Sequence, residues 1–277
     1  MLGALDRCQG QTRSARQNAG FMSWTHYAAP QRFYPLAGRA LPWFAIAALL
    51  LTLAGLTIGL ALAPTDHQQG ESYRIIFVHV PAAWMSMVIY LAMALWAGIG
   101  LVFNARLASM LATALAPTGA LMTFIALWTG ALWGKPTWGT WWVWDARLTS
   151  ELILLFLYLG YLSLHAAIDD SRRADRATAV LTLVGSVNVP IIYFSVQWWN
   201  TLHQGASVSL GSAPSMTGPM LAGMLVMALA LWCYCIAVVL ARARVIILER
   251  ERHTAWVARE LGWVPGAGLA VAQEAVR

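Results

Sequence analysis

The sequence contains few charged residues. Asp, Glu, Lys and Arg make up 11% of its 277 residues, whereas hydrophobic residues make up 59%. A soluble domain normally has about 25% charged residues, so this chain lacks the polar groups that a water-exposed surface needs. A helix that crosses a bilayer takes about 20 apolar residues, and several uncharged stretches reach that length. The composition therefore excludes a soluble domain and predicts an all-α integral membrane protein.

Cysteine is scarce, and its spacing excludes several kinds of chemistry. The three cysteines are Cys8, Cys233 and Cys235, and no two of them form a CxxC pair. Neither a disulfide framework nor a motif for covalent cofactor attachment is indicated. A Walker A sequence, which would bind ATP phosphates, is also missing. We therefore expect neither turnover chemistry nor ATP hydrolysis from this chain.

Long uncharged runs predict a polytopic bundle of six transmembrane helices. The run over residues 177–241 is too long for one helix, and turn-forming residues over 198–219 divide it in two. Pro81, Pro117 and Pro190 are expected to kink helices or to mark their ends. The predicted spans are residues 42–63, 78–103, 111–133, 150–168, 177–197 and 219–241.

Lys and Arg are distributed unevenly about these spans. Fifteen of the 18 Lys and Arg residues lie in the terminal regions or in loops on the same side as the termini. The other three are Arg74, Lys135 and Arg147. Cytoplasmic loops carry an excess of Lys and Arg, so we expect a bacterial inner-membrane protein with both termini in the cytoplasm. Topology accounts for the net charge of +6, and nucleic-acid binding is not indicated.

Three parts of the chain are predicted. Residues 1–39 form a cytoplasmic N-terminal tail, residues 40–241 the transmembrane domain and residues 242–277 a cytoplasmic C-terminal tail. The N-terminal tail lacks the apolar core of a cleavable signal peptide, so the first span is expected to act as its own insertion signal. Residues 1–21 are polar and aperiodic, and we expect them to be disordered or to precede the true start.

Three loops are predicted on the side opposite the termini: residues 64–77, 134–149 and 198–218. Five of the 15 tryptophans fall within residues 133–144, and Trp198 and Trp199 follow in the next loop. An aromatic belt would place tryptophan at both membrane surfaces, whereas this cluster lies on one side. The cluster therefore predicts a tryptophan-rich outer loop shaped for a flat apolar ligand, because indole rings stack on planar π-systems.

The arrangement of these tryptophans depends on the local backbone. If the segment is helical, Trp138 and Trp142 share one face, and Trp141, Trp144 and Asp145 share another. A short helix lying in the membrane interface would present such a row.

Histidines on the tryptophan-rich side suggest what the ligand is. His79 begins the second predicted span and His203 lies just beyond the fifth, each beside apolar or aromatic residues. A single histidine near a helix end is more often interfacial or hydrogen-bonded than a ligand. Imidazole is nevertheless a common ligand of haem iron, and two histidines flanking a tryptophan surface predict axial ligation from both sides. His67, beside Asp66, is only a reserve ligand.

Basic residues on this side are candidates for the haem propionates, which bind Arg or Lys. Lys135 and Arg147 bracket the tryptophan cluster, and Arg74 is the third. Each could instead form an ion pair with Asp145 or Glu151, or extend to the headgroups. Asp145 could alternatively orient a ligand imidazole. The residues alone do not choose between these roles.

These residues match a known pattern. The segment 133–147, which contains the letters WWVWD at 141–145, resembles the tryptophan-rich WWD signature of haem-handling proteins. The histidine-containing segments 79–84 and 198–205 are similar to those of the haem exporter protein C family, which acts in cytochrome c maturation. The resemblance runs over residues 22–250, and the two ends of the chain match nothing in the pattern.

The resemblance implies that the protein holds haem at the outer face of the bacterial inner membrane, on the WWD loop at 133–149. It implies His79 and His203 as the axial ligands. The platform that it implies consists of Trp138, Trp141, Trp142, Trp144 and Asp145. It also implies transfer of haem to a periplasmic haem chaperone, cytochrome c maturation protein E. The other implied partners are an ATP-binding subunit, a second membrane subunit and a small single-span subunit of the export complex.

Two other classes of function stay open. A b-type cytochrome subunit would transfer electrons, but it usually ligates haem between histidines on facing helices. A small-molecule permease usually carries intramembrane charge along its pathway. These spans carry almost none, and Asn188 beside Pro190 is the only suggestive site.

Overall fold

The computed structural model describes residues 29–203 and 216–262, and these residues form helices and connecting segments without a β-strand. Within these ranges, six helical segments are long and apolar enough to cross a membrane. They are Pro30–Leu62, Glu71–Phe103, Arg106–Trp138, Ala146–Ala166, Ser171–Trp198 and Gly218–Arg250. The predicted all-α bundle of six transmembrane helices is therefore confirmed. The disorder expected over residues 1–21 lies outside the described residues.

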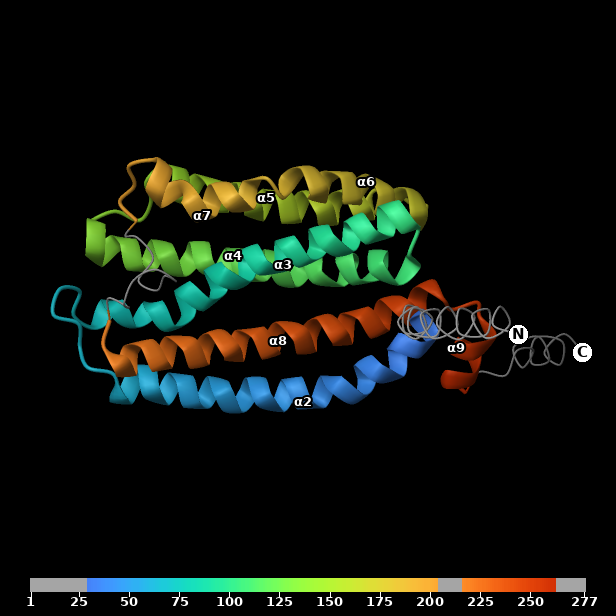
Figure 1. Cartoon of the computed structure of the whole chain (residues 1–277), viewed down its shortest axis with the longest axis horizontal. Helices are drawn as coiled ribbons and strands as arrows, with labels where there is room; N and C mark the ends of the chain where they lie inside the picture. Colours follow the sequence, from blue (N-terminus) through green and yellow to red (C-terminus); the bar gives the residue numbers. More distant parts are fainter. Residues whose placement is uncertain (1–28, 204–215, 263–277) are drawn as a thin grey trace, which may run out of the picture.

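The helices form a bundle in which α3 and α4 lie between two outer groups (Figure 1). On one side, α2 packs along α8, and on the other, α5 packs against α6 and α7. The bounds are α2 Pro30–Thr57, α3 Ile76–Phe103, α4 Arg106–Trp138, α5 Ala146–Ala166, α6 Ser171–Gly185, α7 Asn188–Trp198 and α8 Gly218–Arg250.

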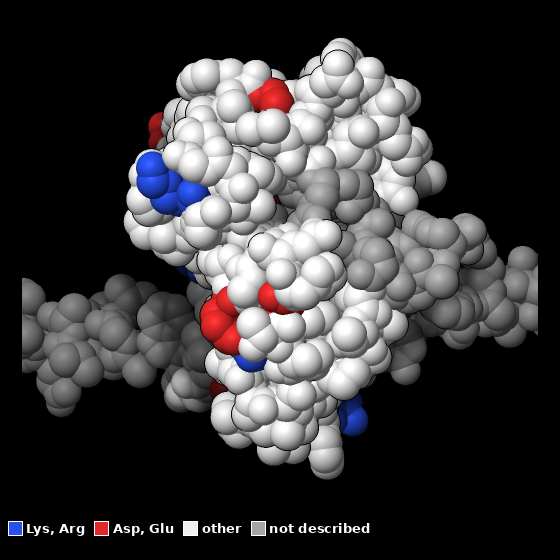
Figure 2. Space-filling view, turned by 90° about the vertical axis from the view of Figure 1, so that its left-hand side faces the viewer, with Lys and Arg blue, Asp and Glu red and all other residues white. Residues whose placement is uncertain are grey.

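Successive spans run in opposite directions, so the connections alternate between two ends of the bundle (Figure 1). The start of α2, the end of α8 and the short helix α9, Ala255–Glu260, share one end, which we call the terminal end. The α4–α5 connection lies at the other, which we call the tryptophan-rich end. Viewed from outside, the tryptophan-rich end shows only small patches of charge (Figure 2).

The helices extend beyond the predicted spans at the terminal end. Helix α2 begins at Pro30 rather than at residue 42, and α8 continues to Arg250 rather than stopping at 241. Proline suits the first turn of a helix because its missing N–H would have no partner there. Apolar runs mark the part of a helix that lipid surrounds, whereas the added turns of α8 carry Arg244 beside the Tyr34 ring and Arg250 bound to Asp175.

The fifth span is two helices. Helix α6 ends at Gly185 and α7 begins at Asn188, so the break comes just before Pro190. Proline has no N–H to donate to the carbonyl one turn earlier, which accounts for the break. Pro81 and Pro117 lie inside α3 and α4 and do not end them.

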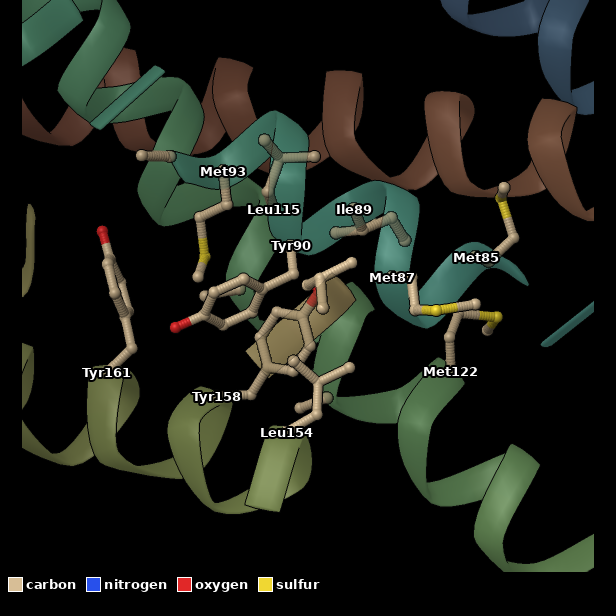
Figure 3. Packing of buried hydrophobic residues seen from close by; sticks show 14 of the residues in the cluster. Met85, Met87, Ile89, Tyr90, Met93, Leu115, Met122, Leu154, Tyr158 and Tyr161 are labelled. Atoms are coloured by element: carbon tan, nitrogen blue, oxygen red, sulfur yellow. The ribbon is translucent and has the colours of Figure 1, made fainter. Parts of the chain in front are cut away.

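The bundle core lies between α3, α4 and α5 (Figure 3). Tyr90 and Tyr158 meet edge to face with ring centroids 5.0 Å apart, and the Tyr158 hydroxyl donates to the carbonyl of Ser86 at 2.8 Å. A Cβ at Gly119 would overlap the Tyr158 ring. Helices in lipid associate through close packing and small residues, so Gly119 lets α5 approach α4 below the tryptophan-rich end.

Candidate functional site

The tryptophan segment is part helix and part extended chain. Helix α4 continues through Trp138 and ends at Gly139, whose φ of 78° is left-handed and favours glycine. Asp145 then caps α5, because its carboxylate accepts the N–H of Leu148 at 2.8 Å. The residues between Gly139 and Asp145 are not helical. The condition for a single helical row of tryptophans is therefore not met.

The two candidate ligand histidines lie close together. Their ring centroids are 6.3 Å apart with an interplanar angle of 35°. His79 is in the first turns of α3 and is 9% exposed, whereas His203 follows the end of α7. Trp133 meets His79 edge to face at 5.6 Å, and Trp138 lies 6.2 Å from His203. Residues far apart in sequence thus form one aromatic cluster.

A small cavity of about 50 Å³ opens beside these histidines. Most of its wall is apolar or aromatic, with Arg147 and Glu151 as its charged groups. It is lined by His79, Ala83, Ala126, Leu127, Gly130, Ala131, Trp133, Trp138, Trp142, Arg147, Leu148, Glu151 and His203.

Five of the residues predicted for the site line this cavity: His79, His203, Trp138, Trp142 and Arg147. Four others lie near it without lining it. Lys135 is exposed and donates to the carbonyl of Gly139 at 3.0 Å, with Nζ 6.0 Å from the centroid of the Trp141 ring. Trp144 is 77% exposed. Asp145 caps α5 through its carboxylate.

Thr129, which sequence reasoning missed, is a hydrogen-bond partner of His79. Nδ1 of His79 lies 3.1 Å from the Thr129 hydroxyl, and that hydroxyl donates to the carbonyl of Ile125 at 2.6 Å. A hydroxyl has one proton to donate, so while it donates to that carbonyl it can only accept a hydrogen from His79 Nδ1. Nε2 is then left with its lone pair, the form in which imidazole binds a metal.

Three buried polar atoms at this end have no hydrogen-bond partner among the described residues: Trp142 Nε1, Asp145 Oδ2 and Glu151 Oε2. The other oxygen of Glu151 accepts from the Ser86 hydroxyl at 2.7 Å. Buried polar atoms are nearly always hydrogen-bonded in proteins. Those of Trp142 and Glu151 belong to residues of the cavity wall, where a bound molecule can reach them. Glu151 lies one turn beyond Arg147 on α5, a spacing that could have indicated its place in the site.

Arg74 has a structural role. Its guanidinium donates to the carbonyls of Gly59 and Ala63 and pairs with Glu71. Gly59 lies in a π-helical turn, Ile58–Leu62, where the wider spacing frees carbonyl groups. Arg74 therefore ties the α2–α3 connection together and does not line the cavity.

The turn that contains His67 supports the site from outside. His67 itself is exposed and does not line the cavity. Asp66 accepts the backbone N–H of Gln69 at 2.8 Å, and this bond lowers the pKa of the Asp66 carboxyl. The side chain of Gln69 accepts the indole N–H of Trp133 at 2.7 Å. The turn thus positions the ring that contacts His79.

Asn188, the residue that suggested a permease, is also part of the scaffold. It is buried at the start of α7 and its amide donates to the carbonyl of Ser150 at 2.9 Å. This bond joins α7 to α5 where the fifth span is broken. The polar side chain is therefore accounted for by packing.

Fold and site together define a polytopic α-helical membrane protein with an aromatic cavity between two histidines. A sequence model described as heme exporter protein C matches residues 23–258. Heme exporter protein C of Escherichia coli is 50% identical over 235 residues, which cover 83% of this chain and 93% of that protein. The namesake from Bradyrhizobium diazoefficiens is 53% identical over 210 residues, covering 76% and 79% of the two chains. That from Paracoccus denitrificans is 44% identical over 218 residues, covering 76% and 90%. The chain belongs to the heme exporter protein C family.

Proposed function

We propose that this chain binds haem between His79 and His203 at the periplasmic face of the inner membrane and delivers it for c-type cytochrome maturation. The distance between the two imidazole rings, 6.3 Å between centroids, carries the proposal. The ring centroids of two imidazoles that ligate one metal ion from opposite sides stand about 6 Å apart, because each metal–nitrogen bond is about 2 Å long and each centroid lies about 1 Å beyond its nitrogen. The relatives' name, heme exporter protein C, points to the same ligand.

Different cavity residues contact different parts of the planar ligand. His79 and His203 supply the axial nitrogens, and Trp138 and Trp142 supply aromatic walls. Arg147 is the basic group of the cavity wall, and its guanidinium also donates to the carbonyl of Ile192 at 2.7 Å. It is our choice for a propionate contact at the inner part of the site. Trp141, Trp144, Lys135 and Asp145 form the rim of the WWD loop.

The direction of transfer follows from the distribution of charge. Arg74, Lys135 and Arg147 belong to the tryptophan-rich end, and the remaining Lys and Arg residues to the terminal end or the tails. By the positive-inside rule, the terminal end faces the cytoplasm and the cavity faces the periplasm. A periplasmic haem chaperone, cytochrome c maturation protein E, is the proposed recipient.

The protein acts in this proposal as a carrier and not as an enzyme. Its polar cavity groups bind and orient, and no Walker A sequence is present to hydrolyse ATP. Energy for release therefore comes from a partner. The proposed complex contains an ATP-binding subunit, a second membrane subunit and a small single-span subunit.

The first experiment compares purified wild-type protein with His79→Ala, His203→Ala and His67→Ala from haem-replete cells. Total haem and the absorption spectrum are recorded for each. We expect a two-histidine low-spin spectrum in the wild type and in His67→Ala, and loss or a spectral change in the other two. Equal haem and identical spectra in all four would place the ligands elsewhere and favour a b-type cytochrome. Absence of haem from every preparation would overturn the haem proposal.

A further inference from the structure

A second hollow lies on the lipid-facing side of the bundle between α4 and α5. It is open to the outside and has a volume of about 430 Å³, and every side chain that lines it is apolar or aromatic. Phe124, Trp128 and Trp144 are 52%, 60% and 77% exposed, so this surface is open on the outside of the bundle. We call it the lateral groove. It is lined by Phe124, Leu127, Trp128, Ala131, Trp142, Trp144, Leu152 and Leu155.

The lateral groove and the histidine cavity share one wall. Leu127, Ala131 and Trp142 line both of them. Two of these are on α4, one turn apart, and the third is on the non-helical segment that follows Gly139. The barrier between lipid and cavity is therefore one layer of side chains thick. Part of that layer is an indole held by a segment without helical hydrogen bonds.

A basic side chain stands at the outer end of the groove. Leu127, Ala131 and Lys135 are spaced four residues apart on α4, so they lie along the same face of the helix. The groove extends inward from there to Phe124, which is about 10 Å below Ala131 at 1.5 Å per residue. Phe124 and Trp128 stack with centroids 6.2 Å apart. A molecule in the groove meets aromatic rings along its body, and Lys135, which does not itself line the groove, lies one turn beyond Ala131 at its outer end.

We propose that the lateral groove is the route by which haem passes from the outer leaflet into the histidine cavity, with Trp142 as the movable part of the shared wall. This inference rests on the proposed function. A flat macrocycle with two carboxylates at one edge matches an aromatic groove with a lysine at its outer end. A second transmembrane helix would be cylindrical and would need no cation there, so the groove favours the macrocycle.

The geometry also accounts for the two basic residues beside the cavity. Lys135 meets the carboxylates at the headgroup level during passage, whereas Arg147 meets them in the cavity. Trp142 lies against both spaces and has a buried N–H without a partner in the described chain. Its displacement therefore breaks no hydrogen bond within the described protein. Opening requires a side-chain movement and leaves the helices in place.

The test measures how fast haem loads from lipid. Wild type, Leu155→Trp and Leu229→Trp are placed without haem in nanodiscs of phosphatidylcholine, and haem dissolved in vesicles of the same lipid is added. Leu155 lines only the groove, so a larger ring there obstructs passage without touching the cavity. Leu229 is a 53% exposed apolar residue of α8, which lines neither space, and it is the matched control. If Leu155→Trp accumulates poorly, Leu152→Phe makes a smaller change in the same groove.

We expect Leu155→Trp to load about tenfold more slowly, which corresponds to about 1.4 kcal/mol in the barrier. The final haem content and spectrum should equal those of wild type and Leu229→Trp. Loading at the wild-type rate would overturn the lateral route while leaving the proposed function intact. Loss of bound haem at equilibrium in Leu155→Trp would make the groove part of the binding site and also overturn it. Only absence of haem from the wild type would overturn the proposed function.

Lys135→Gln separates haem carboxylates from anionic lipid as the partner of the ammonium group. In phosphatidylcholine nanodiscs, no anionic headgroup is present, and Lys135→Gln should still slow the loading of haem. The dimethyl ester of haem, which lacks the carboxylates, should load at the same rate into both proteins. A Lys135→Gln effect that requires anionic lipid would assign the lysine to lipid and overturn its role in the route.

Discussion

The two ends of the bundle use polar residues in opposite ways. At the terminal end, Arg250 donates to both oxygens of Asp175, at 2.7 and 2.9 Å, and lies 3.0 Å from the ring of His165. At the tryptophan-rich end, buried atoms of Trp142, Asp145 and Glu151 have no partner among the described residues. Paired groups stabilise the fold, whereas the unpaired atoms of Trp142 and Glu151 belong to the cavity wall, where a bound molecule can reach them. Among the described residues, the terminal end has one such buried atom, Nε of Arg244.

The terminal end shows how charge can be buried without a binding site. Asp175, His165 and Arg250 come from α6, α5 and α8, so their contacts join the two outer groups of helices. Arg106 pairs with Glu251 at 3.0 Å, and Trp256 donates to the other oxygen of that carboxylate. The guanidinium of Arg244 lies 4.3 Å from the centroid of the Tyr34 ring. This end therefore fixes the relative positions of the helices while the opposite end keeps a cavity.

The largest effect is expected from breaking the terminal cluster. Asp175→Ala removes the carboxylate from Arg250, whose side chain is only 14% exposed. Leaving a buried charge without its partner costs about 3 kcal/mol or more, so unfolding in detergent should shift strongly. Protein that stays folded should keep its haem, because the cavity is at the other end. Arg172→Ala, at an exposed position of the same end, is the control and should change neither property.

A smaller effect, specific to the ligand, is expected at Thr129. Thr129→Val keeps the shape of the side chain but removes the acceptor for His79 Nδ1–H. Loss of the hydrogen-bond partner of a metal-bound histidine typically lowers affinity about 10- to 100-fold. Haem dissociation and the iron–imidazole Raman band report the change. Thr129→Ser, which restores the hydroxyl, should recover both, and its failure to do so would contradict a role through hydrogen bonding.

Two tryptophans at the tryptophan-rich end differ in the same way, because, among the described residues, one has a hydrogen-bonded N–H and the other does not. Trp133 donates its N–H to Gln69, whereas that of Trp142 has no partner in the described chain. Trp133→Phe should therefore lower stability by about 1 kcal/mol, while Trp142→Phe should not lower it. Haem titration should show the reverse order, with about fivefold weaker binding for Trp142→Phe if its N–H meets the ligand. Equal stability losses in the two variants would show that Trp142 is partnered in solution.

Sequence patterns predict some of these features because they are local. Six apolar runs give the six spans, and WWVWD at 141–145 with His79 and His203 marks the tryptophan-rich end. The meeting of the two histidines depends on how α3 packs against α4 and where α7 ends, which no local pattern contains. Thr129 illustrates this limit, since it is 50 residues from His79 in sequence and meets it only across a helix contact.

Helix ends were predicted less well than helix existence, for a physical reason. A hydropathy pattern records where side chains meet lipid, so it stops at the first arginine. Helix α8 continues past Arg242 and Arg244 because later residues such as Arg250 are bound by other helices. The break before Pro190, by contrast, agrees with the expectation that this proline kinks a helix or marks its end, because its missing N–H cannot pair with the carbonyl one turn earlier.

The smallest effect is expected at Asp66, the partnered carboxylate of the tryptophan-rich end. Hydrogen bonds from Gln69 and Gln68 lower its pKa below the ordinary value of 3.8. Its contribution to stability is therefore complete above about pH 4 and is lost as the pH falls through the lowered pKa. The group is partly exposed to solvent, so the contribution is only about 0.5 kcal/mol. Unfolding of the haem-free protein at pH 6 and pH 3 measures it.

Asp66→Asn keeps an oxygen for the two N–H groups but removes the charge, so its stability should not show this part of the pH dependence. The turn also carries Gln69, which holds Trp133 against His79. If Asp66 belongs to the scaffold, haem affinity at neutral pH should be the same in Asp66→Asn and wild type. A change in haem affinity with unchanged stability would instead show that this turn acts on the ligand. The turn would then belong to the binding site and not to the scaffold.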